Sequence, residues 1–102
     1  MLVVLTTAPD ADAAARIAKT LVEEKLAACV NLVPGVRSIY RWEGKLCDDA
    51  EVLLVAKVRA DRFDAYAERM RALHPYEVPE IVALPVERVA RSYLRFVLDS
   101  GS

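Results

Sequence analysis

The feature that most constrains the fold is a pair of long strand-like segments, residues 26–41 and 46–59, which flank a tight turn. The turn, Trp42-Glu43-Gly44-Lys45, contains the glycine that tight hairpins need for a positive φ. Each arm has about 14 residues, whereas an ordinary strand has about 5–6. At roughly 3.3 Å per residue, such an arm reaches about 45 Å. Pro34-Gly35 interrupts the first arm, and we interpret this pair as a bulge or a bend in a long strand rather than as its end.

The turn also predicts how the two arms pair. If residues 42 and 45 flank it, paired positions sum to about 87, so Cys47 lies opposite Tyr40. Cys29 then lies opposite Val58, or opposite Lys57 if the bulge absorbs one residue. The two cysteines are too far apart along the ribbon for an intrasubunit disulfide. A solvated ladder of cross-strand charges is expected from Arg37 and Arg41 opposite Asp48, Asp49 and Glu51.

The elements around the hairpin define a fold class. A strand at residues 2–6 precedes a helix over residues 10–25 with Asp10 as its N-cap, and Asp61 is the expected N-cap of a helix that His74-Pro75 ends. A proline-bounded strand at residues 79–85 and a helix at residues 86–98 complete the chain. This order predicts an α+β, ferredoxin-like (βαββαβ) antiparallel sheet with an extra C-terminal helix. The first and third strands should be central, the fourth should lie at an edge, and residues 1–102 should form one domain.

Composition bears on assembly and on the classes of partner. The chain is 55% hydrophobic, which is high for a small free monomer and favours a subunit interface, although its many alanines offer a simpler explanation. The long ribbon also needs a neighbour, because an isolated two-stranded ribbon is marginal in water. A net charge of −1 gives no reason to expect nucleic acid. The absence of a signal peptide or a long apolar run predicts a cytoplasmic protein without membrane spans.

Few residues have catalytic or metal-binding potential. His74 is the only histidine, and because no nucleophile–base pair or paired-cysteine motif accompanies it, we expect no enzymatic activity. Cys29 lies in an apolar strand, where a cysteine is most often a small buried hydrophobe. Lys57 interrupts a central apolar strand and needs a carboxylate, for which Glu77 and Glu80 are the candidates. Such a pair has two interpretations, a structural contact or the lining of an anion-binding cleft.

Three segments carry a resemblance to a known family. Residues 26–35 read LAACVNLVPG, residues 38–45 read SIYRWEGK, and residues 74–81 read HPYEVPEI. Together they resemble the CutA family of divalent-cation-tolerance proteins over nearly the whole chain. The resemblance implies a ferredoxin-like subunit in a homotrimer similar to the PII signalling proteins, with hairpins that pair between subunits. Phe96 departs from the family pattern, since many members have tryptophan there.

The resemblance also implies functional residues. Cys29 and His74 become the candidate metal ligands, and Lys57, Tyr76 and Glu77 would lie near a cleft between subunits. We therefore expect a homotrimeric protein that binds copper or another divalent metal, requires no cofactor and has itself as its partner. Two alternatives stay open: a PII-like signalling module that binds a small anionic metabolite at the intersubunit cleft, and a structural trimeric anchor.

Overall fold

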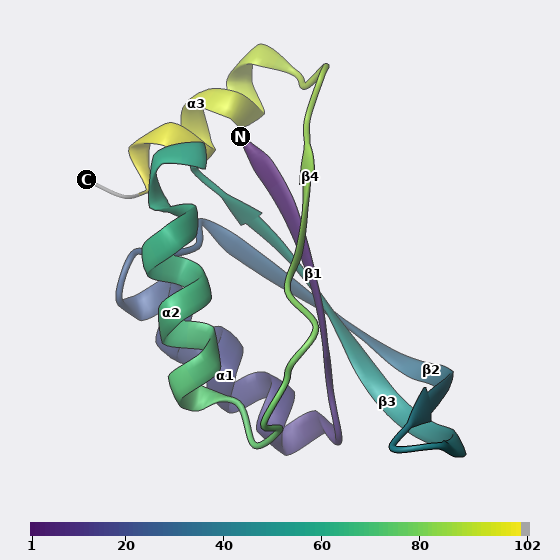
Figure 1. The fold of residues 1–102 in the computed structure, drawn as a ribbon. Coiled ribbons are helices and arrows are strands. Elements are labelled where there is room, and N and C mark those ends of the chain that lie inside the picture. Colours follow the sequence, from purple (N-terminus) through teal and green to yellow (C-terminus); the bar gives the residue numbers. More distant parts are fainter. Residues whose placement is uncertain (101–102) are drawn as a thin grey trace.

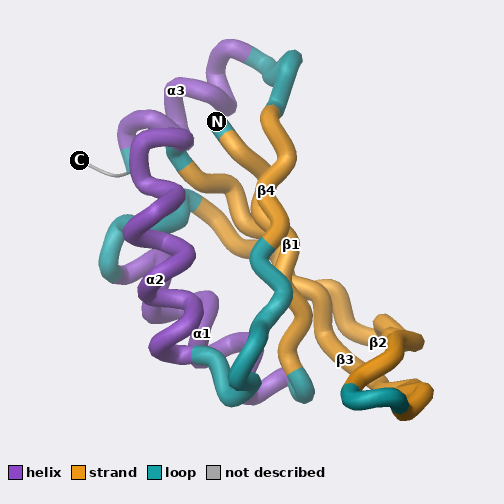
Figure 2. Tube along the Cα trace, viewed as in Figure 1, coloured by secondary structure: helices purple, strands orange, loops and turns teal. Residues whose placement is uncertain are grey.

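The computed structural model describes residues 1–100 and contains one four-stranded antiparallel sheet with helices beside it (Figures 1 and 2). In chain order the elements are β1 (Leu2–Ala8), α1 (Ala11–Glu23), β2 (Cys29–Trp42), β3 (Lys45–Val58), a short 3-10 helix (Ala60–Arg62), α2 (Phe63–Leu73), β4 (Val82–Pro85) and α3 (Arg91–Asp99). The strand order is β2-β3-β1-β4. The predicted α+β fold, with the first and third strands central and the fourth at an edge, is confirmed.

The core lies between one face of the sheet and the helices α1 and α2 (Figure 1). Asp10 begins α1 as predicted, because its Oδ1 accepts from the Ala13 amide at 2.8 Å. The helix then buries one apolar stripe against the sheet, which contributes alternate residues of β1 and β3. Residues of this core that are completely buried include Val4, Ala8, Ala14, Ile17, Leu21, Leu54, Ala56, Val58, Tyr66 and Met70.

The hairpin of β2 and β3 extends well beyond the two helices (Figure 1). Its register shifts between Val33 and Val36, so the predicted bulge at Pro34-Gly35 is confirmed, with Gly35 at φ +81°. Tyr40 lies opposite Cys47, as predicted from the turn. Cys29 lies opposite Lys57, so the bulge absorbs one residue. Every pairing between the bulge and the tip follows from the position of the turn.

Several predicted element boundaries are wrong. Asp61 does not cap α2, because its carboxylate binds the guanidinium of Arg59 at 3.0 and 2.9 Å within the 3-10 turn. The fourth strand begins at Val82 rather than at residue 79. The last helix begins at Arg91 rather than at residue 86, because the Val86 amide still donates to the Met1 carbonyl at 3.2 Å and prolongs the sheet.

Membrane insertion by a helix finds no support in the described chain. Within residues 1–100, none of the helices has the length and apolar character that crossing a bilayer requires.

Candidate functional site

Helices α1 and α2 leave the opposite face of the sheet uncovered, and α3 reaches only the end of it where Tyr93 interacts with Cys29. Register places Val3, Lys57 and Cys29 side by side on this face, followed by the row Leu5, Val55 and Asn31. The edge strand β4 adds Val82 and Leu84, each 47% exposed. We call this surface the open face; its members are Val3, Leu5, Thr7, Cys29, Asn31, Val33, Leu53, Val55, Lys57, Val82 and Leu84. It is mostly apolar, and single soluble chains rarely leave such a patch in water.

Lys57 does not pair with the carboxylates predicted for it. Its Nζ donates to Oδ1 of Asn31 on the neighbouring strand. The expected contact with Glu77 or Glu80 is therefore not formed. Because Asn31 lies on the same face, the ammonium group is held along the open face rather than at the end of α2.

His74 is buried, with 7% of its surface exposed, and both of its ring nitrogens are engaged. The Tyr76 amide donates to Nδ1 at 3.0 Å, so Nδ1 is the acceptor and Nε2 carries the proton. Nε2 in turn donates to the Thr7 carbonyl at 2.8 Å. His74 thus ties the segment after α2 to β1. A metal could bind the ring only by displacing one of these two contacts.

The two predicted metal ligands do not meet within one chain. Cys29 lies level with Val3 on β1, whereas His74 contacts Thr7 four residues further along that strand. Four residues of strand span about 13 Å. Moreover, no group of three or more His, Cys, Asp or Glu side chains gathers to hold a metal ion among residues 1–100. A site that uses Cys29 and His74 together would need ligands from more than one subunit.

The residues predicted to lie near a cleft, Lys57, Tyr76 and Glu77, do not all lie together. Tyr76 lines a cavity of about 370 Å³ between the hairpin and the segment after α2, and Glu77 lines an adjoining one of about 360 Å³. Lys57 lines neither cavity. On β3 it lies six residues from Glu51, which is part of the first cavity, and six residues of strand span about 20 Å. The structure brings Tyr76 and Glu77 together and leaves Lys57 apart.

Two tyrosine–carboxylate pairs shape this end of the hairpin. The Tyr76 hydroxyl donates to Oε2 of Glu51 at 2.7 Å, and the Tyr40 hydroxyl donates to Oδ2 of Asp49 at 2.5 Å. Burial, followed by the bond to Glu51, raises the pKa of Tyr76; the bond to Asp49 is the main cause that raises the pKa of Tyr40. Both hydroxyls therefore keep their protons and act as donors at neutral pH.

The predicted charge ladder forms in part. Arg37 donates to both carboxylate oxygens of Asp48, at 2.7 and 2.5 Å, and this bond lowers the pKa of Asp48. Asp49 and Glu51 instead accept from the tyrosines. The register makes Tyr40 and Asp49 diagonal neighbours across the hairpin, but it does not predict that Tyr76 approaches Glu51 from another segment.

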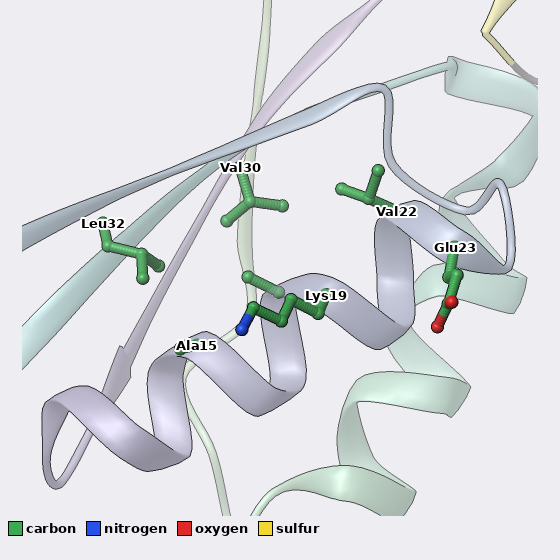
Figure 3. Close-up of a pocket in the computed structure, with 7 residues that line it drawn as sticks. Ala15, Lys19, Val22, Glu23, Val30 and Leu32 are labelled. Atoms are coloured by element: carbon green, nitrogen blue, oxygen red, sulfur yellow. The ribbon is translucent and has the colours of Figure 1, made fainter.

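A separate groove of about 530 Å³ lies between α1 and the edge strand β2 (Figure 3). Its walls are apolar except for Lys19 and Glu23 on the helix. It brings no set of nucleophilic or metal-binding groups together. The lining residues are Ala15, Ala18, Lys19, Val22, Glu23, Val30 and Leu32.

Comparisons with known proteins all lead to the same protein family. Residues 2–100 match the family model described as CutA1 divalent ion tolerance protein. The "Divalent-cation tolerance protein CutA" of Thermus thermophilus is 53% identical over 98 residues, which cover 96% of this chain and 95% of that protein. The rice protein "Protein CutA 1, chloroplastic" is 46% identical over 99 residues; the chain spans 56% of its length. A solved structure of the "Periplasmic divalent cation tolerance protein CutA" from Archaeoglobus fulgidus has a TM-score of 0.95 at 37% identity, and each chain is covered completely.

These names correct one expectation. The sequence predicted a cytoplasmic protein, but the rice and Arabidopsis thaliana relatives are named chloroplastic and the Archaeoglobus protein periplasmic. The same domain thus occurs under names for compartments other than the cytoplasm. A cytoplasmic location does not follow from the residues of this chain.

Proposed function

Because the chain belongs to the CutA1 divalent ion tolerance family, we propose that it is a non-catalytic homotrimer that binds a divalent metal or copper. The observation that carries the assembly is the open face, which is mostly apolar and which α1 and α2 leave uncovered. Three is the number of subunits that the family resemblance implies. The protein requires no resident cofactor for this role.

The hairpin gives a second reason for self-association. Leu46 is 75% exposed, Ile39 64% and Trp42 47%, all on the part of the ribbon that lies beyond the helices. A two-stranded ribbon with such side chains in water is marginal by itself. Packing of the hairpin against neighbouring subunits would cover these side chains and pair the free edge of β2.

For metal binding we propose Cys29 as the primary ligand. Its side chain lies on the open face, so an assembly through that face would bring the thiols of several subunits to the interface. Thiolates suit copper(I). His74 would join such a site only if the metal replaced the Tyr76 amide at Nδ1, because the lone pair of Nδ1 accepts the hydrogen bond from that amide.

A copper(I) titration against a chromophoric chelator, under anaerobic conditions, tests this assignment. We expect Cys29→Ser to weaken copper(I) binding at least about tenfold, since serine offers a much poorer ligand for a soft metal. Cys47→Ser is the matched control and should bind as the wild type does, because Cys47 lies near the hairpin tip opposite Tyr40. Equal affinities for the wild type and both variants would remove Cys29 from the site.

One observation favours a second function, a PII-like signalling module. Tyr76 and Glu77 line adjoining cavities beside the hairpin, so a small metabolite has a place to bind. An anionic ligand would need Lys57 from a neighbouring subunit, because the Lys57 of the same chain lines neither cavity. A structural trimeric anchor, the third candidate, predicts a trimer that binds neither metal nor metabolite.

A further inference from the structure

We draw no further inference here: the strongest candidate, the apolar groove of about 530 Å³ between α1 and the edge strand β2, carries no proposal, because it opens beside the sheet edge that a neighbouring subunit would pair in the proposed trimer and nothing in the structure of residues 1–100 shows what covers it.

Discussion

Replacing Val55 with lysine should separate the assembly into single chains. Val55 lies in the middle of the open face, between Leu5 on β1 and Asn31 on β2. In the proposed trimer this position is buried, and an unpaired buried charge costs several kcal/mol. The new ammonium group would also lie two residues from Lys57 on the same face, which adds repulsion. Light scattering coupled to size-exclusion chromatography measures the result as a fall in particle mass.

The control for this experiment is the same new charge on the helical side of the domain. Ala72 is exposed on α2, so Ala72→Lys should leave the particle mass of the wild type unchanged. If Val55→Lys keeps the mass of the wild type, the open face is not the surface that joins the subunits. Circular dichroism of both variants separates dissociation from loss of the fold.

The second large effect is a gain in stability from Tyr66→Phe. Tyr66 is completely buried, and its hydroxyl finds no hydrogen-bond partner within residues 1–100. Burial without a partner raises the pKa of Tyr66 and leaves a polar group desolvated. Because a buried unsatisfied hydroxyl costs about 1–3 kcal/mol, its removal should raise the free energy of unfolding by a similar amount. Urea unfolding at one fixed protein concentration measures the change, since assembly also contributes to stability.

Tyr76→Phe provides a control with the opposite sign. It removes the same atom, but this hydroxyl donates to Glu51 at 2.7 Å. Loss of the bond should lower the free energy of unfolding by about 1 kcal/mol. If Tyr66→Phe lowers the free energy of unfolding as well, the Tyr66 hydroxyl must have a hydrogen-bond partner, such as an ordered water.

Much of the fold was predictable because a few residues determine long stretches of backbone. Gly44 marks the turn, and the turn determines which residues of β2 and β3 face each other. Pro34 prevents regular pairing in the first arm, so the one-residue shift of the register could be expected near it. Alternating side chains then determine which residues lie on the open face.

Local capping was harder to predict. Asp61 has the position of an N-cap in the sequence, but Arg59 two residues earlier captures its carboxylate, and the main cause of the lowered pKa of Asp61 is this bond. Asp10 forms no salt bridge with a basic side chain within residues 1–100, and it caps α1 as expected. Whether an aspartate caps a helix therefore depends on whether a nearby basic side chain binds its carboxylate. The N-cap propensity of aspartate does not include this competition.

The site was only partly predictable for a related reason. Tyr76 and Glu77 adjoin in sequence, so they reach neighbouring cavities together. We predicted that Lys57 would pair with Glu77 or Glu80, which lie in the segment after α2. Its actual partner, Asn31, is its diagonal neighbour on the adjacent strand β2. The approach of Tyr76 to Glu51 joins segments 25 residues apart, and no sequence pattern indicates that distance.

The central claim is that the sheet and its ribbon are completed by other copies of the chain, and sedimentation equilibrium of the unmodified protein over a dilution series tests it most directly. We predict a single species of about three times the chain mass of 11.3 kDa that persists on dilution. A species of 11.3 kDa that keeps the circular dichroism of the folded protein at every concentration would contradict the account.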